Sequence, residues 1–338
     1  MAFYFALMGD QDRAMTASQQ ALAIAAAHDM AALQDEATTH LGQAYYTRGE
    51  YRHALDLLRP RVARLQGDWL RARLRAGSQV PVFARTVLVL CLAEVGAFHE
   101  GRARGDEGVQ IAEATQHAFS RILAYWGGGL LALGQGDLHD ATPLLERGLA
   151  LCHAAHLPVV LPIFVAALSY AYALAGRHPE AREILAQAMA TMAPGRDSAV
   201  GFQALVRVWV GHAWLRTGRI EEAYALASQA HELAHVHRER GHEAWALHLL
   251  GDIARHHQPP AIEPAATHYQ QALARAEELG MRPLQAHCHR GLGTLYGATG
   301  QREQARTALS TANAMYRAME MTFWLLEAEA ALAQVEGR

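Results

Sequence analysis

The residues best suited to chemistry are polar side chains in the second half of the chain. They are His212, Arg216, Trp245, His248, Asp252, Arg255, His287 and Arg290. Guanidinium and imidazole groups beside an indole can hold the acidic end of a peptide or helix, or a neutral-to-anionic small molecule. We therefore expect these residues to bind a ligand rather than to transform one.

Catalysis is not indicated by the sequence. A nucleophilic mechanism needs a nucleophile and a base within reach of each other, and the sequence offers no such grouping. All 30 residues of the Lys and Arg classes are arginine, so no P-loop lysine and no Schiff-base lysine exist. We expect no enzymatic activity and no cofactor.

Metal binding is not indicated either. His231 and His235 have the spacing of a zinc pair, and His153 and His156 are three residues apart. Neither pair has the glutamate of an HExxH motif or a third ligand at a telling distance. Among 20 histidines such pairs arise by coincidence, and we predict no metal site.

The elements that position these residues follow from one stretch, Pro283 to Arg317. Leu292, Gly293 and Tyr296 share one helical face before a turn at Gly300. The helix after the turn places Ala305, Leu309 and Ala312 on one face. Small residues at these positions let two paired helices approach closely, as in a tetratricopeptide (TPR) hairpin.

The turn glycine of this hairpin recurs along the whole chain. Successive turn glycines are 40, 47, 40, 40 and 42 residues apart, and the last step of 82 spans two repeats. The missing turn falls in the loop 256–260. The period of about 40 exceeds the 34 residues of the common TPR, which favours longer helices. The turn residues are Gly9, Gly49, Gly96, Gly136, Gly176, Gly218 and Gly300.

This register predicts an all-α, TPR-like superhelical solenoid of antiparallel helix hairpins that forms a single domain over residues 1–338. A partial repeat covers 1–30 and a capping helix covers 321–338. The predicted repeats between them are 31–80, 81–118, 119–157, 158–197, 198–241, 242–281 and 282–320.

The first helix of each hairpin should line the concave groove. The later repeats contribute the polar residues named above. The middle repeats contribute a mostly apolar set, which is Phe83, Leu90, Trp126, Leu130, Leu133, Ile163 and Tyr170. The carboxylate clamp of chaperone-binding TPR domains needs Lys and Asn, and this chain has no Lys and one Asn, so that function is disfavoured.

Charge gives no case for a general nucleic-acid or membrane binder, since the formal net charge is −3. One basic cluster occurs near the insertion at 67–80. It could dock an acidic partner or RNA, but a solvated convex face is the favoured interpretation. Its members are Arg59, Arg61, Arg64, Arg71, Arg73, Arg75 and Arg85.

The location is predicted to be the cytoplasm. Three scattered cysteines indicate buried thiols in a reducing compartment, and no signal peptide is recognisable at Met1. The uncharged stretch 157–176 is long enough to cross a bilayer. It begins with two prolines and falls in the repeat register, so a buried helix is favoured over a membrane span.

The two ends are expected to differ. Gly9 is already a turn, so the first helix is short, and a fragment of a longer protein is favoured over a natural short cap. In the last helix, Phe323, Trp324 and Leu325 should pack on the preceding repeat. Glu327, Glu329 and Gln334 should face water, as a cap requires.

The segments 287–312 and 314–334 resemble the C-terminal region of large bacterial signalling proteins. In that family a class III adenylate/guanylate cyclase or a LuxR-type DNA-binding domain is joined to an AAA/STAND ATPase and then to TPR-like repeats. The resemblance implies a scaffold whose catalytic residues lie in another module. It predicts the sensor arm of a signalling ATPase or cyclase, with a protein, peptide or small-molecule effector in the groove; the alternative is a free-standing TPR adaptor.

Overall fold

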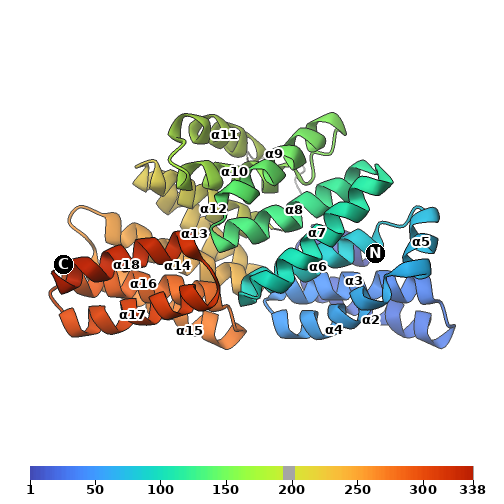
Figure 1. The fold of residues 1–338 in the computed structure, drawn as a ribbon, viewed down its shortest axis with the longest axis horizontal. Coiled ribbons are helices and arrows are strands. Elements are labelled where there is room, and N and C mark those ends of the chain that lie inside the picture. Colours follow the sequence, from blue (N-terminus) through green and yellow to red (C-terminus); the bar gives the residue numbers. More distant parts are fainter. Residues whose placement is uncertain (193–201, 338) are drawn as a thin grey trace.

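A computed structural model describes residues 1–192 and 202–337, which form 18 helices and contain no strand. The helices pair into antiparallel hairpins that follow one another along a superhelix (Figure 1). The all-α, TPR-like solenoid expected from the sequence is therefore confirmed. The expected boundary at 197/198 and the last residue of the chain lie outside the described residues.

Nine helices alternate with the outer helices and supply the inner layer. They are α1 (Ala2–Leu7), α3 (Ala31–Arg48), α6 (Val80–Val95), α8 (Ala118–Gln135), α10 (Leu161–Leu174), α12 (Gln203–Arg216), α14 (Arg240–His256), α16 (Arg282–Ala298) and α18 (Thr322–Glu336).

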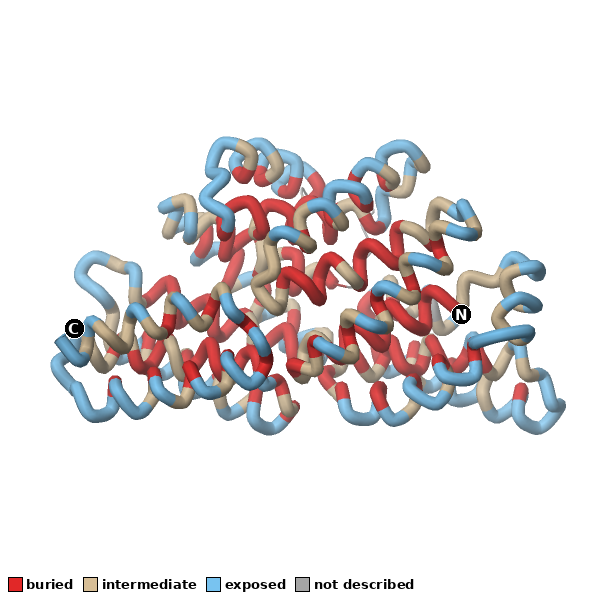
Figure 2. Tube along the Cα trace, viewed as in Figure 1, coloured by how far each residue is buried: buried red, intermediate tan, exposed pale blue. Residues whose placement is uncertain are grey.

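Eight helices form the outer layer, and α5 (Gly67–Arg75) occupies the insertion. The outer helices are α2 (Gln11–Ala27), α4 (Tyr51–Arg64), α7 (Phe98–Thr115), α9 (Leu138–Ala154), α11 (His178–Thr191), α13 (Ile220–Val236), α15 (Ile262–Leu279) and α17 (Arg302–Ala318). Figure 2 shows that buried residues concentrate on the inner helices, whereas the outer helices expose most of their surface.

The hairpin turns depend on glycine. Every turn glycine that the sequence singled out has a positive φ, from +71° at Gly176 to +88° at Gly136. In this left-handed region a Cβ atom is strained, whereas glycine adopts it freely and ends the helix. Within the hairpins, small residues set the helix spacing, because a methyl group on Gly293 would lie 2.6 Å from Leu309 Cγ.

The superhelix returns on itself. α3 contacts α14 and α6 contacts α16, although these helices are far apart in the sequence. In Figure 1 the N-terminal repeats therefore lie beside the C-terminal repeats along the lower edge. We call this contact the seam. It converts a concave groove into an interior.

The seam is built by hairpin turns of the first half and by junctions between repeats of the second half. His237 Nδ1 lies 3.2 Å from the Gly9 carbonyl oxygen, and Gln135 Nε2 donates to the Glu320 carbonyl oxygen at 3.4 Å. Arg238 pairs with Asp12 at 2.9 Å. A Cβ atom at Gly49 would lie 3.0 Å from the Gly241 nitrogen, and one at Gly136 would lie 2.9 Å from the Trp324 indole nitrogen, so these turns leave no room for larger residues.

The basic cluster is only in part the solvated face that the sequence favoured. Its exposed members are Arg59, Arg64, Arg71 and Arg75. Arg85, in contrast, is 1% exposed and pairs with Glu107 at 2.6 Å. Arg61 and Arg73 flank the buried Asp35, at 2.7 and 3.4 Å. These three arginines tie α4, α5 and α6 to neighbouring helices, because carboxylates of these neighbours lie within reach. Sequence distance hid the pairing, since Asp35 precedes Arg61 by 26 residues.

The apolar stretch 157–176 forms the 14-residue helix α10, which is largely buried among its neighbours. In the described part of the chain, no single helix is both long and apolar enough to span a bilayer. The one pair that passes such a test together, α5 with α6, is bent by 116°.

The seam makes a prediction for Gly241, which starts α14 against the Tyr51 ring. A methyl group there would lie 1.9 Å from the Tyr51 hydroxyl oxygen, whose side chain is buried. Gly241→Ala should lower the free energy of unfolding by about 1–3 kcal/mol, because overpacking forces the two halves apart. Denaturant unfolding measures this change, and small-angle scattering should show an expanded particle.

Gly105→Ala is the matched control, because a methyl group there meets nothing nearer than 3.9 Å. It should leave the particle dimensions unchanged and stabilise α7 by up to about 1 kcal/mol through helix propensity. Equal behaviour of the two variants would show that the seam does not constrain the superhelix.

Candidate functional site

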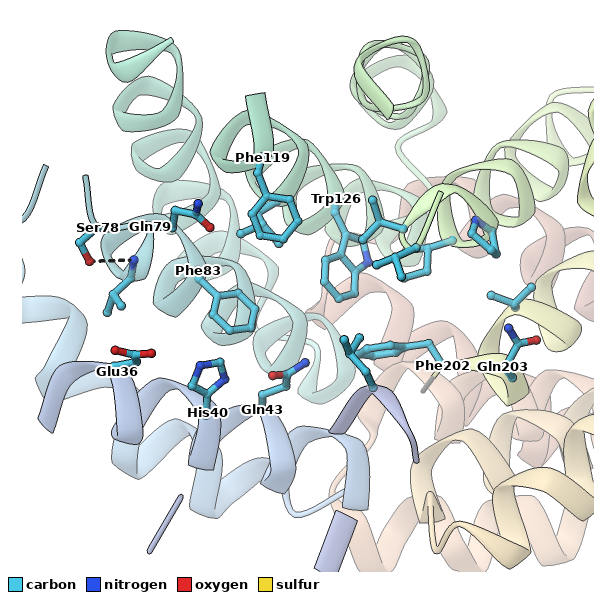
Figure 3. Close-up of a pocket in the computed structure, with 18 of the residues that line it drawn as sticks. Glu36, His40, Gln43, Ser78, Gln79, Phe83, Phe119, Trp126, Phe202 and Gln203 are labelled. Carbon is cyan, nitrogen blue, oxygen red and sulfur yellow. Dashed lines mark hydrogen bonds between the residues drawn. The ribbon is translucent and has the colours of Figure 1, made fainter. Parts of the chain in front are cut away.

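The inner helices enclose an apolar cavity of about 400 Å³. Its walls come from α1, α3, α6, α8, α10 and α12, together with the residues just before α6, α10 and α12 (Figure 3). Rings from separate repeats point into it. The apolar lining consists of Leu7, Val80, Phe83, Phe119, Leu123, Trp126, Val159, Val160, Pro162, Ile163, Phe202 and Val206.

One buried donor on the wall of this apolar cavity has no hydrogen-bond partner in the protein. It is the indole Nε1 of Trp126, a side chain that is 5% exposed. Leaving such an atom unpaired costs about 1–3 kcal/mol, which a bound neutral group such as an amide could recover.

A second cavity of about 620 Å³ lies at the other end of the interior, and its wall is polar. All eight polar residues that the sequence predicts to bind a ligand line this cavity, and so does Tyr170. They come from α10, α12, α14 and α16, and α18 closes the far side with Trp324 and Glu327. The repeat register therefore brings residues from five helices to one place.

Aromatic and imidazole rings from consecutive repeats form a ladder along this polar cavity. Tyr170 stacks on His212 with ring centroids 5.1 Å apart. His212 and His248 are 5.9 Å apart, and His248 and His287 are 5.8 Å apart. Trp324 ends the ladder edge-on to His287 at 4.7 Å. The rings come from consecutive inner helices, α10, α12, α14, α16 and α18.

Burial keeps the imidazoles of the ladder neutral. It lowers the pKa of His212 to about 3 and lowers the pKa values of His248 and His287 as well. Burial alone would raise the pKa of Asp252, but the positive charges around it, Arg255 and Arg290 among them, outweigh burial and lower that pKa. The Asp252 carboxylate also accepts a hydrogen bond from the Tyr269 hydroxyl at 2.6 Å.

A partition separates the two large cavities. Phe202 packs edge-on against Trp126, with centroids 5.2 Å apart, and also contacts Tyr46. Glu94 accepts a hydrogen bond from the Trp245 indole at 3.1 Å across the seam, and its burial raises its pKa. A small cavity of about 80 Å³ remains beside this partition.

The structure distributes the predicted groove residues over three places. Phe83, Trp126 and Ile163 line the apolar cavity. Leu90, Leu130 and Leu133 line the small cavity, which also touches some of the ladder. The polar cavity takes Tyr170, His212, Arg216, Trp245, His248, Asp252, Arg255, His287 and Arg290.

Sequence reasoning was wrong about Glu327, which does not simply face water. Its carboxylate turns into the polar cavity and pairs with Arg216 at 3.3 Å and with Arg290. The superhelix curves so that the inner face of α18 continues the groove wall. Phe202 was missed because it precedes its helix. Gln43 was missed because it lies on α3, and the predicted groove residues begin only at Phe83 on α6.

The histidine pairs considered for metal binding have other partners. His235 Nδ1 lies 3.1 Å from Glu243 Oε1, and His231 lies 3.9 Å from the same carboxylate. Within the described residues, one group has metal-like geometry, formed by Asp137, His139 and Asp140. Arg102 pairs with both of its carboxylates, at 2.9 and 2.5 Å, which satisfies their charge.

Comparison with known proteins supports the fold. No family model matches the sequence, and a search of curated proteins found no match. A solved structure of the Rap conjugation gene regulator of plasmid pLS20, in complex with the Phr* peptide, superposes with a TM-score of 0.63. It is 16% identical over 88% of this chain and 78% of that one.

Two further structures agree. A Rap protein complexed with Competence and Sporulation Factor gives a TM-score of 0.55 at 16% identity over 73% of this chain. This chain spans 64% of that protein, which is less than two thirds of it. The APC/C hetero-tetramer Cut9–Hcn1 gives 0.50 at 13% identity over 90% of this chain and 61% of that chain. These likenesses show a TPR-like helical-repeat fold.

The buried ladder makes a prediction for acid stability. A histidine whose folded pKa lies below its unfolded value of about 6.5 keeps its full stability above that value and loses it as the pH falls toward the folded pKa. When the pH falls from 7.5 to 5, each ladder histidine that stays neutral in the folded protein should lower the free energy of unfolding by about 2 kcal/mol. Urea unfolding at the two pH values measures the loss.

His212→Phe removes one such group from the ladder and should reduce the acid loss by about 2 kcal/mol. His139→Gln is the matched control, because His139 has a side chain that is 97% exposed, and its acid loss should equal that of the unchanged protein. An unaltered acid loss in His212→Phe would mean that His212 is charged in the folded state.

Proposed function

We propose that this chain is a non-catalytic scaffold whose interior binds a peptide or a small-molecule effector. The apolar cavity carries this proposal. Its volume of about 400 Å³ falls within the range of ligand pockets, about 300–1,000 Å³. An apolar wall with a few polar atoms is the common composition of such pockets, and the Trp126 donor is one such atom.

The structural neighbours support a peptide as one class of ligand. Both Rap structures are complexes, one with the Phr* peptide and the other with Competence and Sporulation Factor. Their interiors are built from the same kind of repeat. An extended peptide could place an apolar side chain in the cavity and pair a main-chain carbonyl with the Trp126 indole.

The cellular role that we propose is the sensor arm of a larger cytoplasmic signalling protein. The resemblance of the last repeat to the TPR tails of bacterial ATPases, cyclases and LuxR-type regulators supports this role. The arm would report effector binding to such a module. It would act by protein contacts and would bind neither nucleic acid nor membrane. The coding sequence upstream of Met1 tests this role, because an in-frame ATPase or cyclase module is required.

The alternative is a free-standing adaptor that assembles proteins through its outer surface. Large apolar side chains exposed near the N-terminal end favour it. They are Tyr4, Met8, Ile24 and Met30, of which Tyr4 is 57% and Ile24 56% exposed. An adaptor of this kind would bind its partner equally well with its interior blocked.

Blocking the apolar cavity separates the two functions. Val160 lines this cavity and is 9% exposed, so Val160→Trp should fill part of the space. We expect peptides selected from a synthetic library against the unchanged protein to bind this variant at least about tenfold more weakly, a loss of about 1.4 kcal/mol. Fluorescence anisotropy with labelled peptides gives the affinities.

Ile24→Trp, on the outer helix α2, is the matched control and should bind like the unchanged protein. Circular dichroism confirms that both variants fold. If Val160→Trp binds the selected peptides normally while Ile24→Trp does not, the interior is not the binding site and the adaptor function is preferred.

A further inference from the structure

The polar cavity already contains a carboxylate supplied by the protein itself. Glu327 extends from α18 between Arg216 on α12 and Arg290 on α16. One of its oxygens lies 3.3 Å from Arg216 Nη1, and the other contacts Arg290 Nη1. Both guanidinium groups also lie over the Trp324 ring, at 5.9 and 5.0 Å from its centroid. The arrangement fits a planar carboxylate closely.

Even with Glu327 in place, the wall carries an excess of positive charge. Three guanidinium groups, of Arg216, Arg255 and Arg290, face two carboxylates, of Asp252 and Glu327. The neutral ladder imidazoles add no charge. One further negative charge would therefore balance the cavity, and a monoanion supplies it without the repulsion that a second charge would bring.

We propose that the polar cavity is a binding site for a carboxylate group of the ligand, and that Glu327 competes for it. The proposal rests on the interior binding a ligand, as proposed above, and it assigns the ligand's chemistry at the second cavity. The ligand carboxylate takes the place of Glu327 between Arg216 and Arg290. Glu327 thereby lowers the affinity and keeps the empty site satisfied.

The carboxylate could belong to the C-terminus of a peptide or to a small organic acid. Both present the same two oxygens to the arginines, so the site chemistry is shared. An organic acid brings only an alkyl chain, whereas a peptide also brings amide groups. Matched probes can distinguish them, because each acid has an uncharged amide of nearly the same shape.

The test uses hexanoate with hexanamide, and N-acetyl-leucyl-leucine with its C-terminal amide. Binding is followed by the fluorescence of the tryptophans, of which Trp245 and Trp324 line the cavity. We expect each acid to bind more tightly than its amide. In Glu327→Gln the affinity for both acids should rise about tenfold, because a competing charged hydrogen bond is lost. The acid that binds more tightly identifies the ligand class, which is a small organic acid if it is hexanoate and a peptide C-terminus if it is N-acetyl-leucyl-leucine.

Glu329→Gln is the matched control. Glu329 is on the same helix and pairs with Arg317 at 2.8 Å, outside the polar cavity. This variant should bind the acids as the unchanged protein does. Arg290→Gln should lose the preference of acid over amide. If Glu327→Gln folds poorly, the comparison of acid with amide in the unchanged protein still decides the question.

Equal affinity for acids and amides, or no gain in Glu327→Gln when it folds, would overturn the carboxylate site. The wider function would then stand or fall separately, since its test uses the apolar cavity and Val160→Trp. Conversely, the acids could bind Val160→Trp normally but Arg290→Gln more weakly. This result would support the carboxylate site without supporting ligand binding in the apolar cavity.

Discussion

The seam between the first and last repeats is the contact on which the interior depends. A TPR-like solenoid that did not return on itself would present an open groove to water. Here α3 meets α14 and α6 meets α16, so the groove becomes a space walled on several sides. The contact is possible because glycines occupy the approaching backbone. A Cβ on Gly49 would lie 3.0 Å from the Gly241 nitrogen.

The seam and the cavities share residues, which makes the interior one coupled unit. Trp245 donates to Glu94 across the seam and also lines the polar cavity. Tyr46 on α3 contacts Phe202, which lines the apolar cavity, and His242 on the facing repeat. A ligand in either cavity therefore contacts side chains that hold the two halves together. This gives the repeat scaffold a physical route by which a bound ligand would alter the shape of the superhelix.

The architecture was predictable because it repeats. A turn glycine and small helix-facing residues recur about every 40 residues, so each hairpin confirms the next. The register also placed His212, His248 and His287 on the groove side of successive repeats, and the structure lines them up in one ladder. Such inference works because equivalent positions in stacked repeats must point the same way.

The seam, Glu327 and the buried Arg85 were not predictable in the same way. The seam results from small rotations summed over the repeats, and no local pattern in the sequence records that sum. The sequence around Glu327 resembled a polar capping helix. The side chain of Glu327 points into the polar cavity only because the superhelix curves around α18. Arg85 had a basic neighbourhood in sequence, but its partner Glu107 comes from the next helix.

Photo-crosslinking from the interior tests the central claim most directly. Benzoylphenylalanine would replace Phe119, which lines the apolar cavity, and in a second protein Ile24, which is on the outer surface. Each protein is illuminated with the same synthetic peptide library, and the adducts are measured by mass spectrometry. The account predicts peptide adducts at position 119 and few at position 24. Adducts only at position 24, or equally at both, would contradict it.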